Sequence, residues 1–249
     1  MLIPFMQSCL NGYDDASEDP NMSAMPYNAA LATVVVSGEL PGEAVIEIDD
    51  EGHAYVVNPE ILTRYEVNDP GNRIFCLYSI AESPSGMHDS KAPYIRIREL
   101  QKILTKGIDI LQDGEEDVYG HDGINYIAHH LGKNYLTLQF QIYGFNTSIK
   151  HRISLVAKEG AVPDENGLLS VELRHNAEGD EQKYLSRSGY VSFPLSTAPG
   201  YKEGTLKGFN MEYQSFNGEK KSVTISHTNS KSQEFFPFIQ AEVSNTKSK

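Results

Sequence analysis

The chain has 249 residues, which is enough for one large domain or for two domains that each bury their own core. Its formal charge is −13, and no large cluster of Lys and Arg is present, which excludes nucleic acid and an anionic membrane surface as expected partners. No apolar run approaches the roughly 18 residues of a membrane-spanning helix, so none is predicted.

Residues 1–9 form a short apolar stretch that ends in Ser8 and Cys9 and is followed directly by polar sequence. This pattern resembles the end of a bacterial lipoprotein signal peptide, in which Cys9 becomes the lipidated first residue. The resemblance implies a membrane anchor at Cys9, because acyl chains stabilise attachment by about 0.8 kcal/mol per buried CH₂. The bulky Gln7 and the missing basic segment depart from the pattern, and they indicate a start assigned too far downstream. An ordinary tail with a chance cysteine is the alternative.

Residues 10–23 are predicted to be a flexible tether. They include four acidic side chains and several turn formers, and residues 11–21 contain no large aliphatic residue. Such a segment cannot bury enough apolar area to fold. An acidic stretch behind a lipidated cysteine also resembles the surface-export signal of lipoproteins in some Gram-negative anaerobes, which implies the outer membrane and the cell surface.

From Tyr27 onward, short strands alternate with Gly, Asn, Asp and Pro, which indicates an all-β class. A hairpin turn is expected at residues 49–52, and one helical turn is expected to start near Asn58. Cys76 lies in an apolar run and is interpreted as a small buried hydrophobe. The first five predicted strands are Leu31–Val36, Ala44–Ile48, His53–Val57, Arg73–Ile80 and Tyr94–Leu100. They fit a small barrel of the oligonucleotide/oligosaccharide-binding (OB) type, although their spacing also permits a two-layer sandwich.

The second half shows a clear period of two. Leu136, Leu138, Phe140 and Ile142 face one way and the residues between them face the other, as in a half-buried strand. The pattern recurs in residues 149–155, 169–173, 191–195, 209–213 and 223–225. Six such strands predict a sandwich of two antiparallel sheets. We therefore expect a barrel over residues 24–106, a sandwich over 107–230 and a C-terminal tail over 231–249.

The order and spacing of several short segments resemble the NigD-like lipoproteins, over roughly residues 28–230. The segments are Asp49–His53, Gly71–Ile74, Ile103–Lys106, Gly123–Ile124, Asn134–Phe140 and His151–Leu155. The resemblance implies an envelope protein with an OB-like barrel followed by a β-sandwich, and it implies no established biochemical activity. One position departs from the family, because residues 129–132 read His-His-Leu-Gly where a Trp is expected.

Motifs of catalysis and metal binding are missing from the sequence. No Gly-x-Ser-x-Gly, Ser-x-x-Lys set or phosphate-binding loop occurs, so no catalytic residue, enzyme activity or cofactor is predicted. The eight His residues lack metal-ligand spacing, and His151 is interpreted as a hydrogen-bonded core residue. A set of acidic residues lies near the boundary between the two predicted domains: Asp109, Asp113, Glu115, Glu116, Asp117 and Asp122. Their spacing does not match that of a helix-loop-helix calcium site. The set is therefore either a solvated interdomain loop or a calcium site of another kind.

The sequence favours a binding or assembly module held in the envelope through Cys9. Fourteen Tyr and ten Phe supply possible stacking surfaces, among them Tyr135 and Tyr143, while the absence of Trp weakens the case for a sugar site. The expected partner is an envelope protein, held through a sheet edge or face, or a polysaccharide. A glycan-binding accessory protein is one alternative. A hydrolase with two carboxylates flanking a cleft is another.

Overall fold

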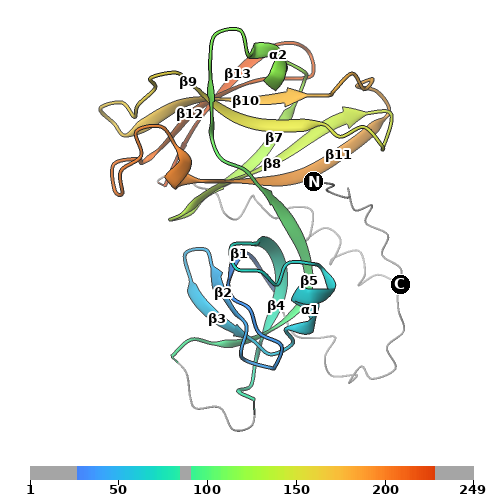
Figure 1. Cartoon of the computed structure of the whole chain (residues 1–249), viewed down its shortest axis with the longest axis vertical. Helices are drawn as coiled ribbons and strands as arrows, with labels where there is room; N and C mark the ends of the chain where they lie inside the picture. Colours follow the sequence, from blue (N-terminus) through green and yellow to red (C-terminus); the bar gives the residue numbers. More distant parts are fainter. Residues whose placement is uncertain (1–26, 85–90, 228–249) are drawn as a thin grey trace.

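The protein consists of a β-barrel and a β-sandwich that meet at one long strand (Figure 1). The structure, a computed structural model, describes residues 27–84 and 91–227. The predictions for residues 1–9 with Cys9, for the tether at 10–23 and for the tail at 231–249 lie outside the described residues.

Five strands close the barrel. Neighbours pair antiparallel in the order β3-β2-β1-β4-β5, and β3 pairs in parallel with the start of β5. Their bounds are β1 (Asn28–Val36), β2 (Val45–Ile48), β3 (Gly52–Val56), β4 (Arg73–Ala81) and β5 (Tyr94–Thr105). The barrel predicted from the sequence is confirmed, and the sandwich alternative for this half is wrong because β3 and β5 close the sheet.

Local sequence explains the barrel's turns and core. Asp50 and Gly52, in the β2–β3 hairpin, have φ angles of +65° and +94°, which Gly adopts freely and Asp tolerates. The predicted helical turn is α1 (Glu60–Arg64), and it packs Ile61 and Leu62 into the barrel core. The core also contains the alternate residues of β1 that point inward.

Strand β5 joins the barrel to the sandwich. It extends to Thr105 instead of ending at Leu100 as predicted, because residues 101–103 keep pairing with β4. Its last residues, Leu104 and Thr105, pair in parallel with β11. One eight-stranded sheet therefore runs through both bodies, in the order β3-β2-β1-β4-β5-β11-β8-β7.

The sandwich packs β11, β8 and β7 against a second sheet with the order β13-β12-β10-β9-β6. The all-β class is confirmed, and most of its pairs are antiparallel, with β10–β12 and β6–β9 as parallel pairs. The bounds are β6 (Asp109–Leu111), β7 (Asn125–Leu131), β8 (Tyr135–Gly144), β9 (Arg152–Lys158), β10 (Leu168–Asn176), β11 (Leu185–Pro194), β12 (Gly208–Gln214) and β13 (Lys220–Ser226). Two short helices, α2 (Glu116–Tyr119) and η2 (Leu195–Thr197), complete this half.

Two of these strands were not predicted. β6 has three residues and lies within the acidic run, too short to show a period. β7 does not alternate between apolar and polar residues, and its register shifts between Tyr126 and Ala128. A bulge breaks the period of two, because one extra residue changes which face the following side chains occupy.

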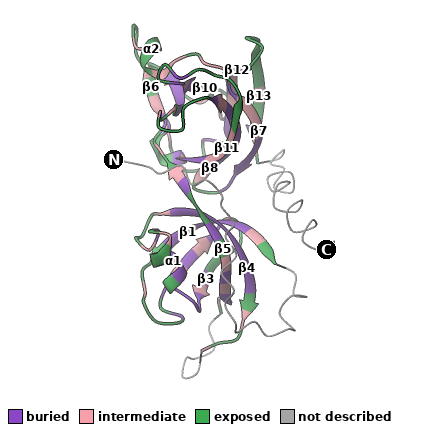
Figure 2. Ribbon diagram, turned by 90° about the vertical axis from the view of Figure 1, so that its right-hand side faces the viewer, coloured by how far each residue is buried: buried purple, intermediate pink, exposed green. Residues whose placement is uncertain are grey.

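A small apolar cluster fixes the barrel against the sandwich. Leu31, Phe75, Leu77 and Ile103 are buried on the outside of the barrel and pack with Ala128 of β7. Figure 2 shows that buried residues extend along the barrel strands. Burying each large side chain contributes about 1.5–3 kcal/mol, so this contact resists hinge motion between the two bodies.

The outer face of β8 departs from the prediction. Thr137 and Gln139 were expected on the open side of a half-buried strand, but both are buried. Thr137 meets Arg73 of the barrel and Ser192 of β11. The barrel thus covers the face that a sandwich alone would leave to water.

Candidate functional site

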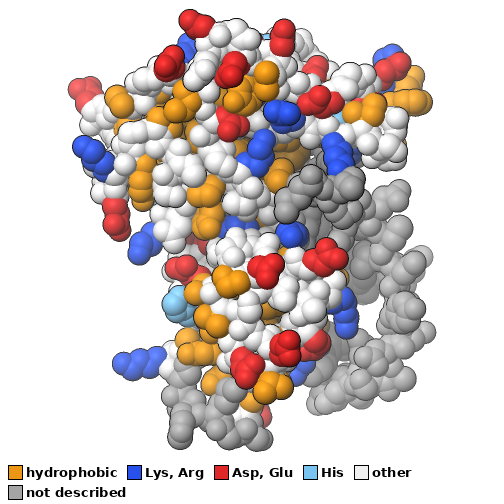
Figure 3. All heavy atoms as spheres, in the orientation of Figure 1, with side chains coloured by type: hydrophobic (Ala, Val, Ile, Leu, Met, Phe, Trp, Pro, Cys, Tyr) orange, Lys and Arg blue, Asp and Glu red, His pale blue; other side chains and the backbone are white. Residues whose placement is uncertain are grey.

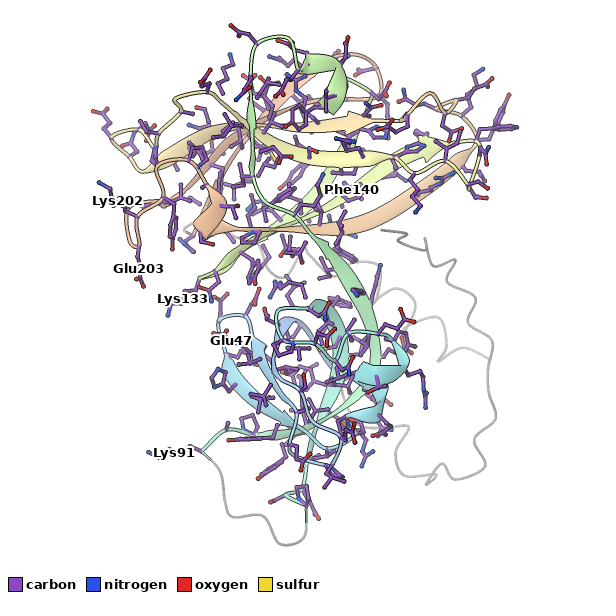
Figure 4. All side chains as sticks on the ribbon, in the orientation of Figure 1. Glu47, Lys91, Lys133, Phe140, Lys202 and Glu203 are labelled. Atoms are coloured by element: carbon purple, nitrogen blue, oxygen red, sulfur yellow. The ribbon has the colours of Figure 1, made fainter. Side chains whose placement is uncertain are left out.

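A cleft of about 260 Å³ lies where the barrel meets the sandwich. Strands β1 and β2 contribute one side, and the β7–β8 turn and the chain after β11 contribute the other. Its lining residues are Thr33, Glu47, Asn134, Tyr135, Pro194, Ser196 and Tyr201. In Figure 4, Glu47 and Lys133 lie on this side of the molecule, with Lys202 and Glu203 on the loop above them. Its polar groups are hydroxyl, phenol, amide and carboxylate groups, and apolar surface lies beside them.

Arg73 lies behind the cleft and contacts two of its lining residues, Thr33 and Tyr135. Its guanidinium is fully buried and donates to both carboxylate oxygens of Asp49, each at 2.7 Å. It also donates to Thr33 at 3.0 Å and to Thr137 at 3.3 Å, and its centre lies 4.3 Å from the ring centroid of Tyr135. A bidentate Arg–carboxylate pair fixes geometry in two directions. Thr33 and Tyr135 line opposite sides of the cleft, and both contact Arg73, so the Arg73–Asp49 ion pair fixes the position of both sides.

Further polar contacts extend this network into the sandwich. Thr137 and Ser192 hydroxyls lie 2.7 Å apart. His130 of β7 approaches Asp49 at 3.6 Å and Asp50 at 3.4 Å. Burial lowers the pKa of His130, although the two carboxylates oppose that shift. His130 is therefore a neutral neighbour of the ion pair near neutral pH.

A second buried network occupies the opposite end of the sandwich. His175 Nδ1 lies 2.9 Å from the carbonyl oxygen of Gly123, and His175 Nε2 lies 2.8 Å from His151 Nδ1. His151 Nε2 lies 3.0 Å from Asp180 Oδ2. The side chains of His151 and Asp180 are 0% and 2% exposed, so the network is sealed from solvent.

The hydrogen-bond partners assign the protons in this network. Burial raises the pKa of Asp180, but the amides of Phe145 and Asn146 and the imidazole of His151 outweigh that effect and lower it to about 2. Burial lowers the pKa of His175 to about 4. Neutral His175 must donate its Nδ1 proton to the Gly123 carbonyl, so its Nε2 accepts. His151 Nδ1 then donates to His175 Nε2, and His151 Nε2 faces the Asp180 carboxylate.

A group of exposed, mainly aromatic side chains lies next to this second network, and the two are joined by the hydrogen bond from the Phe145 amide to Asp180. We define the aromatic tip as Phe145, Tyr184 and Leu185, which are 59%, 81% and 42% exposed. The rings of Phe145 and Tyr184 meet edge to face at 6.3 Å, and the Phe145 amide donates to Asp180 at 2.9 Å. Tyr184 has a φ of +66°, a conformation that is uncommon outside Gly and clusters at functional sites. Figure 3 shows hydrophobic side chains at this right-hand end of the sandwich.

The structure places several residues that the sequence singled out. Cys76 is fully buried, and burial raises the pKa of its thiol to about 12, which confirms the interpretation as a buried hydrophobe. His151 is confirmed as a hydrogen-bonded core residue. His129 contacts Tyr126 while His130 contacts Asp49, so this adjacent pair does not share a site. Tyr135 lies on Arg73 at the cleft.

The acidic set does not converge on a metal site. Over residues 27–84 and 91–227, no group of three His, Cys, Asp or Glu side chains is arranged to hold a metal ion. Asp122 accepts the Ala177 amide at 2.7 Å and the Gln182 amide group at 2.6 Å. The interpretation of this run as a plain interdomain loop is wrong, because it contains β6 and α2.

Sequence reasoning missed the residues that organise both ends of the sandwich. Arg73 begins an otherwise apolar strand, and a charged residue in such a run is a detectable sign of a buried pair. Asp180 gave no comparable sign, because it lies in a polar loop and its partners Phe145 and His151 are about 30 residues away in the sequence.

Comparisons with known proteins agree with this architecture. A family model described as the NigD-like C-terminal beta sandwich domain matches residues 107–227. A protein of unknown function from Bacteroides vulgatus is 24% identical with a TM-score of 0.64, and the similarity covers 81% of this chain and 91% of that one. A NigD-like immunity protein from Bacteroides caccae is 20% identical with a TM-score of 0.53, over 80% and 93% of the two chains.

A candidate lipoprotein from Bacteroides fragilis is 12% identical with a TM-score of 0.58, over 81% of this chain and 98% of that one. At these identities the solved structures show a shared fold. None of the curated proteins is significantly similar to the chain. Within the part of the chain that the structure describes, no helix is long and apolar enough to cross a membrane.

Proposed function

We propose that the protein is a lipid-anchored protein of the bacterial envelope that acts as a binding or assembly module, because residues 107–227 match the model of the NigD-like C-terminal beta sandwich domain. The resemblance to the NigD-like family is thereby confirmed. We place its anchor at Cys9, its tether at residues 10–23 and its position at the surface of the outer membrane. The signal-like sequence before Cys9 and the similarity to a candidate lipoprotein support this placement.

The aromatic tip is the observation that supports the binding role. Phe145 and Tyr184 expose much of their rings at one end of a rigid sandwich. Aromatic side chains are enriched at the centres of protein interfaces, where their burial contributes most of the affinity. Asp180 fixes the loop beneath Phe145, so little conformational freedom is lost when a partner binds. We therefore assign the tip to contact with a partner protein of the envelope.

A catalytic role fits the structure less well. The His151–Asp180 pair has the hydrogen bond of a base and its orienting carboxylate, but both side chains are sealed from solvent. A general base must lie within hydrogen-bond reach of the proton that it removes from a substrate. Asp180, which His151 contacts, instead accepts the amide of Phe145 and so stabilises the loop that carries the aromatic tip.

Site-directed photo-crosslinking in native membranes tests this function. A photoreactive phenylalanine analogue at position 184 should form a discrete adduct with another envelope protein when the full chain is irradiated in its host. The matched control places the same analogue at Val162, which is 66% exposed and lies beside Gly200, the residue before Tyr201 of the cleft lining. Adducts from position 184 alone support the proposal. No adduct from 184, or equal adducts from both positions, contradicts it.

A further inference from the structure

The cleft between barrel and sandwich has the dimensions of a site for one small ring. Its volume of about 260 Å³ lies below the about 300–1,000 Å³ of pockets that take drug-sized ligands. Both bodies line it, and they share strand β5 and a buried cluster. The cleft is therefore preformed, so a ligand would bind without first bringing the two bodies together.

Its polar groups are available to a ligand. Among the described residues, no ion pair involves Glu47, and no hydrogen bond is formed by the side chains of Asn134 or Ser196. Glu47 offers two acceptor oxygens, Asn134 offers a donor and an acceptor, and Ser196 offers both in one hydroxyl. The rings of Tyr135 and Tyr201 add flat apolar surfaces beside these groups. Arg73 lies against the ring of Tyr135 and fixes its orientation.

This lining selects against other classes of ligand. No Lys or Arg is among the lining residues, and the whole chain has a charge of −13, which disfavours a phosphate or another anion. A divalent cation needs several oxygen ligands, whereas Glu47 is the lone carboxylate of the lining. A purely apolar ligand would leave the carboxylate and amide groups desolvated without partners, which costs free energy.

We infer that the cleft binds an uncharged saccharide ring, with its hydroxyl groups on Glu47, Asn134 and Ser196 and its C–H face on the tyrosine rings. Carboxylates and amides suit vicinal hydroxyls because each of those side chains offers two hydrogen-bonding atoms. Aromatic rings accept the apolar face of a sugar while their polar edges keep hydrogen bonds. The inference goes beyond the proposed assembly role, which concerns the opposite end of the sandwich, and either one can fail alone.

Saturation-transfer NMR on the purified full chain tests the inference. The probes are the methyl glycosides of glucose, galactose, mannose and N-acetylglucosamine, each at about 10 mM, because single-ring ligands bind with dissociation constants near the millimolar range. Wild-type protein should transfer saturation to at least one of them. Glu47→Gln and Asn134→Ala should each reduce that signal at least about fivefold while the melting temperature stays unchanged.

The matched control is Glu203→Gln, which removes the same charge from the neighbouring loop outside the cleft lining (Figure 4). It should keep the wild-type signal. The inference is overturned if none of the four glycosides receives saturation, or if glucuronic acid does and the neutral sugars do not. It is also overturned if Glu47→Gln binds as well as Glu203→Gln does.

Discussion

Each end of the sandwich depends on a carboxylate with little solvent exposure, 12% for Asp49 and 2% for Asp180, and the two carboxylates have different partners. At the cleft, Asp49 pairs with the fully buried guanidinium of Arg73, a side-chain type that is not deprotonated in proteins. At the aromatic tip, Asp180 pairs with His151, which is hydrogen-bonded to His175, a residue whose pKa burial lowers to about 4. The cleft network joins two bodies, whereas the tip network stabilises loops within one. A paired carboxylate therefore stabilises the contact between the two bodies at one end, and at the other end it belongs to a network whose stability depends on pH through His175.

The surfaces above these networks differ in the same way. The cleft presents hydrogen-bonding groups in a small hollow, which suits a small polar ligand. The tip presents rings that project into solvent, which suits the larger surface of a protein. The two proposed sites lie at opposite ends of the sandwich, so the proposals predict that a partner protein and a saccharide bind without competing.

The largest effect is expected from breaking the ion pair at the cleft. Arg73→Met removes the cation and leaves Asp49 without its buried partner, which typically costs about 3–5 kcal/mol of unfolding free energy. It also releases Thr33 and Tyr135, so saccharide binding should be lost with the stability. Denaturant unfolding of the full chain measures the cost.

Asp50→Asn is the matched control for this experiment. Asp50 is the next residue in the hairpin, and its side chain is 60% exposed, so its removal should change the unfolding free energy by less than about 0.5 kcal/mol. Equal effects of Arg73→Met and Asp50→Asn would show that the ion pair does not hold the two bodies together.

A smaller effect is expected at the tip end as pH falls. His175 has a pKa of about 4 in the folded protein, against a usual value of 6.5, so the unfolded chain takes up this proton first. Stability from His175 is fully present above pH 6.5 and is lost progressively down to pH 4, by on the order of 3 kcal/mol. Asp180, with a pKa of about 2, stays ionised over this window.

Unfolding free energies between pH 7 and pH 4 measure this loss. His175→Gln cannot titrate, so it should reduce the slope in this window, whereas Asp50→Asn should keep the wild-type slope; the slope that remains in His175→Gln includes the part from His130, whose pKa burial also lowers. If His175→Gln shows the wild-type slope, the tip network is not the source of the pH dependence, and the contrast between the two ends fails.

The sequence predicted the architecture better than the sites, for a physical reason. Gly, Asn, Asp and Pro between short apolar runs located the barrel strands, and a period of two, which reports which face of a strand is buried, located most of the sandwich. It failed for β7, where a bulge and burial on both faces remove the period. It also failed at Thr137, because the covering element is the barrel, which lies far away in the chain.

The sites arise from contacts between distant residues. The cleft lining comes from five separate stretches of chain, and no local pattern marks Glu47 or Tyr201 as neighbours. The imidazole of His151 was foreseeable as a core group, since it continues an apolar face. Its partner Asp180 was not, because loops bring carboxylates to buried donors without a sequence period.

Both surfaces serve the proposed role when the body is held at the envelope, so the anchor is the most direct test of the account. The measurement is metabolic labelling of the full chain with a radioactive fatty acid in its host, comparing wild type, Cys9→Ala and Cys76→Ala. The account predicts label in wild type and in Cys76→Ala, where the buried cysteine is the one removed, and none in Cys9→Ala. Label that survives Cys9→Ala, or no label in any of the three proteins, would contradict the anchor and the envelope location together.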